Sequence, residues 1–352
     1  MEGESRSVSF EGIIGHERPI GILQRAIRNG TLAHAYLFSG DGGIGKKLTA
    51  FALAAAVNCR EEGTGDGCGK CPACRQISAG THPDVHVVLP ESENKQFLAT
   101  LSTKEAEKAS SEIKIDQIRD AQASISLMPS DGSVKFLIID GADTLNAAAQ
   151  NAFLKTLEEP PGQSVIIMLS SRPQSLLPTI RSRCQEIRFL PLPRRELAQA
   201  LTERRNLSED DAWFLAALAQ GSMGRGLEMD VRQEREARTE LAALRSALRE
   251  MGAGEIVARA ETLSRDRERF ERLLDIGIEQ LRDALVLHES GDEKLLVDGR
   301  GADFHREWAE RTGRQRLVAE LELFSASRGL LDRRVAGQLV AENLLLSLGR
   351  PY

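Results

Sequence analysis

The segment Gly40-Asp41-Gly42-Gly43-Ile44-Gly45-Lys46-Lys47 sets the interpretation of the whole chain. It follows the phosphate-binding loop pattern at every position except the last, where a lysine stands in place of Ser or Thr. In such loops, backbone N–H groups and the next helix's N-terminal end bind phosphate oxygens, and the first lysine neutralises their charge. The apolar run at 35–39 predicts a strand before the loop, and residues 48–57 predict a helix after it. An α/β nucleotide-binding domain is therefore expected.

The hydroxyl group that would hold Mg²⁺ is missing from this loop. Lys47 occupies its position, and Thr49 lies about 200° further round a helix of about 3.6 residues per turn. We expect Gly40, Gly45 and Lys46 to form a degenerate nucleotide site, at which ATP or ADP binds weakly or not at all.

Length and charge narrow the class of protein. At 352 residues the chain is long enough for about two or three domains. Its 46 basic and 52 acidic residues give a net charge of −6, which argues against general coating of DNA. We find neither an apolar run of about 18 residues nor a signal-peptide pattern. We expect a cytoplasmic protein without membrane contact.

Four of the five cysteines are closely spaced, at Cys59, Cys68, Cys71 and Cys74. Four thiolates at this spacing can bind one tetrahedral Zn²⁺, and a full set of protein ligands indicates a structural role. An iron–sulfur cluster fits the same ligands, and reduced thiols in an exposed loop are the plainer alternative. The nearby histidines, His82 and His86, are expected to be ordinary loop and strand residues.

Further apolar runs predict the rest of a parallel sheet. They lie at 85–89, 134–140, 165–169 and 187–190, with helices expected at 18–28, 113–127 and 146–158, and a polar insertion at 91–111. The second of these runs ends on Asp140, a further candidate residue of the nucleotide site. The next position, where a glutamate would polarise the attacking water, is Gly141, and Asp143 could replace it only if the loop curled back. Ser170 and Ser171 fit both a phosphate-sensing role and a simple strand end.

Taken together, these motifs resemble the AAA+ subunits of bacterial clamp loaders over residues 10–228. The resemblance rests on the phosphate loop, the inserted cysteine module, the strand ending at Asp140 and two further segments, Leu154-Lys155-Thr156-Leu157-Glu158-Glu159-Pro160-Pro161 and Thr179-Ile180-Arg181-Ser182-Arg183-Cys184. It implies a subunit of the DNA polymerase III clamp loader. Such a subunit would assemble into a hetero-pentamer with gamma/tau and delta subunits, which loads the sliding beta clamp on primed DNA.

Three departures bear on which type of subunit the chain resembles. Lys47, Gly141 and Gly224 replace residues that the ATP-hydrolysing gamma/tau type uses for hydrolysis, with Arg225 displaced by one position. The pattern is similar to the non-hydrolysing delta-prime type, with the gamma/tau type as the alternative. The resemblance also implies that Arg183 is an arginine finger, which acts in trans on the ATP site of a neighbouring subunit. Cys184 is expected to be a small buried residue.

The last third of the sequence has helical spacing throughout, with charged residues on the other faces. The resemblance implies three domains: an AAA+ domain at residues 1–190 that carries a zinc module at 59–74, a helical lid at 191–230 and an all-α collar at 231–352. A different class of function is also possible from the residues alone, namely a zinc-dependent DNA-binding module on a decayed fold.

Overall fold

The computed structural model describes residues 8–61, 65–94, 98–99, 109–132, 134–248, 250–297, 302–333 and 335–349. Most of the polar insertion expected at 91–111 lies outside these residues. The chain separates into two compact units, one formed by Met1–Ala200 with Gly221–Leu227 and the other by Leu201–Gln220 with Glu228–Tyr352. The division into three domains at 190/191 and 230/231 stays a prediction.

The first unit is built on a parallel five-stranded sheet with the order β2-β3-β4-β1-β5. Its strands are β1 (Ala35–Ser39), β2 (Val85–Val88), β3 (Lys135–Asp140), β4 (Ser164–Ser170) and β5 (Gln185–Arg188). The three central strands, β3, β4 and β1, are buried almost throughout, as continuous apolar runs in a parallel sheet require. Because the strands are parallel, Ser39, Asp140 and Ser170 end at the same edge of the sheet.

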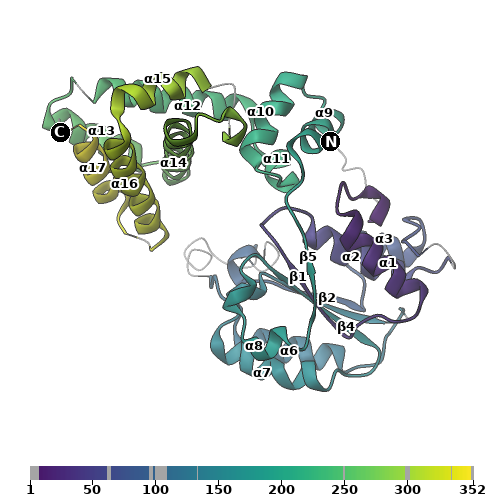
Figure 1. Cartoon of the computed structure of the whole chain (residues 1–352). Helices are drawn as coiled ribbons and strands as arrows, with labels where there is room; N and C mark the ends of the chain where they lie inside the picture. The colour runs from purple at the N-terminus through teal and green to yellow at the C-terminus, as the bar shows by residue number, and fades with distance from the viewer. Residues whose placement is uncertain are drawn as a thin grey trace. The chain divides into compact units, whose positions relative to one another are not determined.

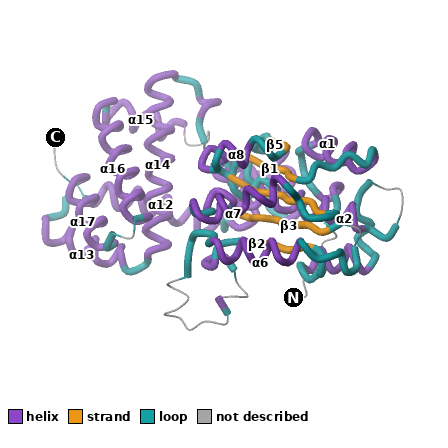
Figure 2. Tube along the Cα trace, turned by 90° about the horizontal axis from the view of Figure 1, so that it is seen from below, coloured by secondary structure: helices purple, strands orange, loops and turns teal. Residues whose placement is uncertain are grey.

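Helices cover both faces of this sheet (Figures 1 and 2). On one face, Tyr36 and Phe38 pack with α1 (Glu17–Arg28), α2 (Lys46–Asn58) and α3 (Pro72–Ala79). On the other face, Ala35 and Leu37 pack with α6 (Ile115–Ile125), α7 (Ala147–Glu158) and α8 (Pro178–Arg181). Successive residues of a strand point to opposite faces, so one short strand serves two hydrophobic cores. The predicted α/β domain with a parallel sheet is confirmed.

The predicted elements agree with the observed ones except at the last strand. The expected strand at 187–190 runs instead from Gln185 to Arg188. This strand lies at the edge of the sheet, where only Ile187 is buried and Glu186 accepts a hydrogen bond from Ser39 Oγ at 2.7 Å. Leu190, which extended the apolar pattern, is 61% exposed and lies outside the strand. Backbone pairing with β1 therefore determines where this strand begins and ends, whereas the hydrophobic pattern does not.

The second unit is helical, as the spacing predicted. It contains α10 (Glu209–Ala219), α12 (Val231–Ala247), α13 (Ala253–Ser264), α14 (Arg267–Ser290), α15 (Ala302–Thr312), α16 (Arg314–Asp332) and α17 (Gly337–Leu348). The long helix α14 packs against α12, α13, α15 and α16 around the buried rings of Phe270 and Phe324. Helix α9 (Arg194–Arg205) begins in the first unit and ends in the second, whereas α11 (Met223–Glu228) belongs mainly to the first. Among the described residues, no helix is long and apolar enough to cross a membrane.

Candidate functional site

The loop between β1 and α2 is held by hydrogen bonds to every backbone carbonyl from residue 40 to 45. Lys46 Nζ donates to the first two carbonyls, Gly40 and Asp41, at 2.5 and 2.6 Å. Thr49 Oγ1 donates to the last, Gly45, at 2.9 Å. The carbonyls between them bind Ser222 Oγ (Gly42 O, 3.0 Å), Gly224 N (Gly43 O, 2.8 Å) and His16 Nε2 (Ile44 O, 2.6 Å). The loop is thus fixed by its own lysine and by three neighbouring segments.

The second lysine of the loop lies where the magnesium site would be. Lys47 Nζ is 2.9 Å from Oδ2 of Asp140, at the end of β3. Burial lowers the pKa of Lys46, while the nearby carboxylates of Asp140, Asp143 and Asp41 act in the opposite direction. Thr49 is unable to replace the missing hydroxyl because its Oγ1 is bound to Gly45 O within α2. The fold therefore brings Gly40, Gly45, Lys46 and Asp140 together, with a lysine ammonium ion beside the aspartate.

The first turn of α11 packs directly on the loop. Gly224 N donates to Gly43 O, and a Cβ atom added to Gly224 would lie 3.0 Å from both Gly43 Cα and Gly43 O. Real Cβ atoms rarely come this close, so the position accepts only glycine unless the loop or the helix shifts. An arginine side chain at 224 would have to displace this contact.

Asp143 does not take over the role of the missing glutamate. Its carboxylate accepts hydrogen bonds from Ser171 N at 3.0 Å and Ser171 Oγ at 3.3 Å, and it pairs with Arg172 at 3.4 Å. Burial raises the pKa of Asp143, but its hydrogen bonds and Arg172 outweigh burial and lower it. Gly141 has φ of 76°, a left-handed conformation that would strain a glutamate. The polar groups after β4 therefore bind one another, which agrees with the strand-end interpretation of the serines.

Arg183 lies apart from the loop, in the turn between α8 and β5. Its Nη2 atom is 2.7 Å from Glu158 Oε1 at the end of α7, and its Nη1 atom donates to Thr179 O at 2.8 Å. The side chain is 34% exposed, so the guanidinium group remains accessible. The sequence motif around Glu158 pointed to the family, but it did not indicate this contact. The neighbouring Cys184 packs near Met168 and is only half-buried, whereas a buried residue was expected. Desolvation still raises the pKa of its thiol to about 12, which disfavours the nucleophilic thiolate.

The four clustered cysteines come together as predicted. The Sγ atoms of Cys59, Cys68, Cys71 and Cys74 all lie within 4.8 Å of one another. A tetrahedron with Zn–S bonds of about 2.3 Å has edges of about 3.8 Å, so small side-chain movements would complete a metal site. Three backbone N–H groups donate to the sulfur atoms, with N···Sγ distances of 3.3–3.4 Å. The donors belong to Cys68, Cys71 and Cys74, and the acceptors are Sγ of Cys59, Cys68 and Cys71, respectively. These donors favour thiolate, the form that binds metal.

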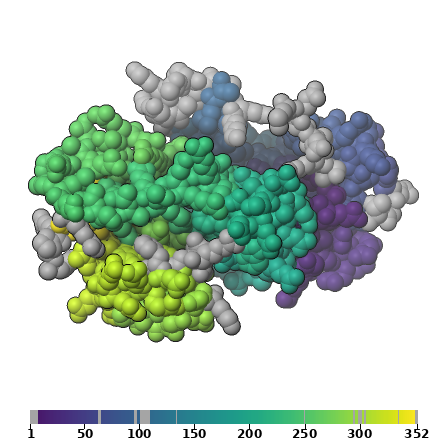
Figure 3. Space-filling model, turned by 90° about the horizontal axis from the view of Figure 1, so that it is seen from above, coloured from purple at the N-terminus to yellow at the C-terminus, as the bar shows by residue number. Residues whose placement is uncertain are grey.

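The cysteine module is anchored to the first unit. Cys71 caps the N-terminus of α3, which packs on α2. Asp66 accepts a hydrogen bond from Phe10 N at 2.9 Å, which ties the module to the N-terminal segment. In the space-filling view, the indigo segment after α2 accordingly lies beside the purple N-terminal residues (Figure 3). The histidines are engaged elsewhere: His82 Nδ1 accepts from Asp84 N, and His86 contacts Ser124 Oγ. As predicted, neither belongs to the cluster.

These features define a P-loop-type α/β protein with an altered magnesium position, an accessible arginine and a tetracysteine cluster. The family model described as "DNA polymerase III, delta subunit" matches residues 15–193, which is just over half of the chain. The chain belongs to this family.

Curated relatives carry related names. A DNA polymerase III subunit delta' of Pseudomonas aeruginosa is 40% identical over 161 residues, covering 46% of this chain and 44% of the relative. The corresponding Bacillus subtilis subunit delta' is 36% identical over 187 residues, covering 53% and 51%. A Bacillus subtilis subunit tau is 33% identical over 233 residues, covering 64% and 37%. The chain thus spans about half or less of the length of these relatives.

Among solved structures, a gamma subunit-related protein of DNA polymerase III from Thermotoga maritima matches with a TM-score of 0.44 and 16% identity, covering 94% of this chain and 98% of that one.

Proposed function

We propose that this chain acts as a clamp-loader subunit of the delta-prime type, which contributes interfaces and an arginine instead of hydrolysing ATP itself. The contact between Lys47 and Asp140 carries this proposal. In phosphoryl transfer, Mg²⁺ bridges the phosphate oxygens and neutralises their developing charge. A lysine paired with the aspartate that would help to hold the ion competes with that arrangement. The names of the delta' relatives support the same assignment.

The partners follow from that assignment. We infer that residues 1–190 form an AAA+ domain, residues 191–230 a lid and residues 231–352 a collar that associates with other subunits. The complex would be a cytoplasmic hetero-pentamer with gamma/tau and delta subunits, which loads the beta clamp on primed DNA. A fixed phosphate loop suits a subunit against which others move. ATP or ADP would bind it weakly or not at all.

We further infer that Arg183 completes the ATP site of a neighbouring subunit. A guanidinium group supplied in trans stabilises negative charge on the transferring phosphoryl group. Such a role needs an arginine that is accessible and held in one direction. Arg183 meets both conditions, because it is 34% exposed and is bound by Glu158 and Thr179 O.

The cysteine cluster is proposed to hold structural Zn²⁺. The metal, when bound, would cross-link the segments that carry Cys59, Cys68, Cys71 and Cys74. Four protein ligands leave no open position for substrate. The cluster would then stabilise the module without taking part in hydrolysis.

The experiment that tests the function combines the isolated chain and the assembled complex. The purified chain with Mg²⁺ and ATP should show no hydrolysis that Lys46→Ala removes. The same chain, mixed with gamma/tau and delta subunits, should form a stable complex that loads a beta clamp on primed DNA. Omitting this chain should abolish loading.

The alternative is an ATP-hydrolysing subunit of the gamma/tau type. The tau relative matches a larger share of this chain than the delta' relatives do. Turnover by the isolated chain that Lys46→Ala abolishes would establish this alternative and overturn the proposal. A loss of DNA affinity on zinc removal would instead indicate the DNA-binding module.

A further inference from the structure

Arg245, on α12 of the helical unit, places its guanidinium group between two aromatic rings. Its Cζ atom lies 4.3 Å from the ring centre of Trp308 on α15 and 5.3 Å from that of Phe324 on α16. Contacts of a cation with aromatic faces favour the charge and fix the plane of the guanidinium group. The rings accept no conventional hydrogen bonds, however, so the N–H donors of Arg245 need acceptors from elsewhere.

Two of those donor atoms have no acceptor. Nε and Nη2 of Arg245 are buried and make no hydrogen bond with any described residue. Burial lowers the pKa of this guanidinium group to about 10, although Glu320 acts in the opposite direction. A buried charged donor without an acceptor is costly, so proteins usually pair such groups. Nη1 is not among these buried atoms, and an anion that accepts a hydrogen bond from it would offset part of this cost.

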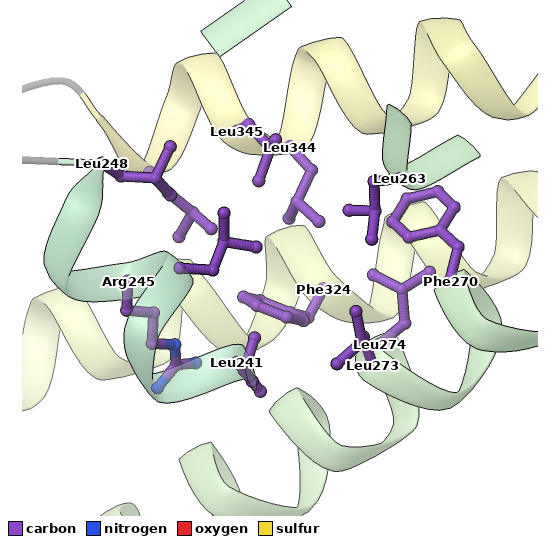
Figure 4. Close-up of a pocket in the computed structure, with 12 residues that line it drawn as sticks. Leu241, Arg245, Leu248, Leu263, Phe270, Leu273, Leu274, Phe324, Leu344 and Leu345 are labelled. Atoms are coloured by element: carbon purple, nitrogen blue, oxygen red, sulfur yellow. The ribbon is translucent and has the colours of Figure 1, made fainter. Parts of the chain in front are cut away.

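The apolar side of Arg245 offers no room for that group. It borders a cavity of about 10 Å³, the space of about one water, lined by Leu241, Leu248, Phe270 and other apolar side chains (Figure 4). Those walls provide no polar partner. An anion must reach Arg245 from another direction.

A second, larger cavity of about 140 Å³ also borders Arg245. Its walls include Arg245, Trp308, Arg311, Thr312, Arg316 and Glu320. The lining carries three arginines and one acid, so its charge is positive. Glu320 accepts a hydrogen bond from Arg316 Nε at 3.0 Å, and Arg311 pairs with Glu307. Of the three arginines in this wall, Arg311 and Arg316 each form an ion pair, whereas Arg245 forms none with the described residues.

We propose that this cavity, the Arg245 pocket, binds a small oxyanion of the size of inorganic phosphate. Guanidinium groups match phosphate oxygens in geometry as well as in charge. One water needs about 10–15 Å³ measured in the same way, so 140 Å³ has room for a small anion. The Thr312 hydroxyl in the wall can donate a further hydrogen bond. The site lies within the helical unit and does not depend on the proposed clamp-loader function.

The test is a calorimetric titration of the full chain with inorganic phosphate. The ionic strength is kept constant by lowering the chloride concentration as phosphate is added. Wild type should bind phosphate saturably. Arg245→Met keeps much of the packing of the side-chain stem but removes the donors, and affinity should fall by roughly tenfold or more. Arg311→Gln should weaken binding less. Arg265→Met is the matched control, because Arg265 is exposed, pairs with Glu261 and does not line the pocket; its affinity should equal that of wild type.

Two further measurements distinguish the Arg245 pocket from the phosphate loop and from a purely structural role of Arg245. The phosphate loop could also take phosphate, so the titration is repeated with Lys46→Ala, which should still bind. Thermal unfolding without phosphate should leave Arg245→Met as stable as wild type or more so, because an unpaired charge is removed. Phosphate should then stabilise wild type but not Arg245→Met. Absence of saturable binding, binding lost in Lys46→Ala, or binding unchanged in Arg245→Met would each overturn the proposal, and Arg311→Gln decides the matter if the methionine variant does not fold.

Discussion

Lys47 and Asp140 form an ion pair, with Nζ 2.9 Å from Oδ2, at the edge of the sheet where a phosphate loop and a strand end normally share a metal ion. The ammonium group carries a single fixed charge and three donors, whereas Mg²⁺ carries two charges and an octahedral shell that includes water. Substitution of one for the other removes the group that would position a nucleotide's phosphates for reaction. The neighbouring phosphate lysine, Lys46, binds Gly40 O and Asp41 O instead.

Replacing Lys47 by threonine should make nucleotide binding depend on magnesium. The variant frees Asp140 and supplies a hydroxyl, so Mg²⁺ should raise its ATP affinity by on the order of tenfold, or ~1.4 kcal/mol. Calorimetry with and without Mg²⁺ measures this effect. Lys47→Met is the control, since it removes the charge without adding a ligand and should gain no magnesium dependence. Neither variant should hydrolyse ATP, because Gly141 provides no base. A wild-type chain whose ATP binding already requires Mg²⁺ would contradict this account.

The contact of Gly224 with Gly43 predicts that Gly224→Ala destabilises the protein, although Gly224 lies in helix α11. Ala usually stabilises a helix relative to Gly by roughly 0.5–1 kcal/mol. At 224, however, its methyl group would meet the backbone of Gly43 at 3.0 Å, and forced packing of this kind costs about 1–3 kcal/mol. Gly254 in α13 is the matched control, because nothing lies within 4 Å of its added Cβ. Urea unfolding should therefore show opposite signs for the two changes. Equal stabilisation by both would show that the loop yields freely.

These contacts mark what the sequence could predict and what it could not. Lys47, Asp140 and Gly224 were each recognisable as departures or motif positions, because a linear motif defines which residue type belongs at each position. Their mutual packing depends on how β3 and α11 reach the loop, which spacing does not reveal. The buried strands were predictable because parallel strands are apolar on both faces. Edge strand β5 was misplaced because a single buried residue, Ile187, gives almost no periodic signal.

Asp84 should make the protein sensitive to acid. Burial raises the pKa of this carboxyl, but N–H donors from Ser130, Asp131 and Gly132 at 2.7–2.8 Å outweigh burial and bring the pKa to about 2, below its ordinary 3.8. A lowered folded-state pKa stabilises the protein above the ordinary value, and this contribution is lost as pH falls from about 4 through about 2. It amounts to about 2 kcal/mol.

Asp84→Asn should therefore unfold at lower urea concentration at pH 7 and lose much of the wild-type pH dependence between pH 4 and 2. Asp116→Asn provides the control, since Asp116 is 81% exposed and should change neither property. A wild-type stability that stays flat across this acid range would rule out the role of Asp84.

The cysteine cluster predicts one tightly bound zinc ion per chain. Metal analysis of protein purified without chelators should find it, and Cys74→Ser should reduce it, because Cys74 is the buried ligand of the cluster. Removal of zinc should lower the unfolding temperature, since the metal binds the folded arrangement only. Cys184→Ser should keep the metal, as Cys184 lies outside the cluster. Iron with visible absorption in place of zinc would indicate an iron–sulfur cluster.

Arg183 and Glu158 predict graded effects on a neighbouring ATP site in the reconstituted complex. Arg183→Ala should slow hydrolysis at the site that it faces by about 10³ or more, while assembly is retained. Glu158→Gln removes the charge that orients the guanidinium group, but an exposed ion pair contributes only about 0–1 kcal/mol, so the loss should be at most several-fold. Glu159→Gln, which alters the adjacent acid in the same motif, should have no effect. Single-turnover kinetics on complexes that contain each variant measures these rates, and size-exclusion chromatography confirms assembly. Unchanged hydrolysis with Arg183→Ala would exclude the finger, whereas a Glu158→Gln complex as slow as Arg183→Ala would show that the carboxylate itself contacts the neighbouring site.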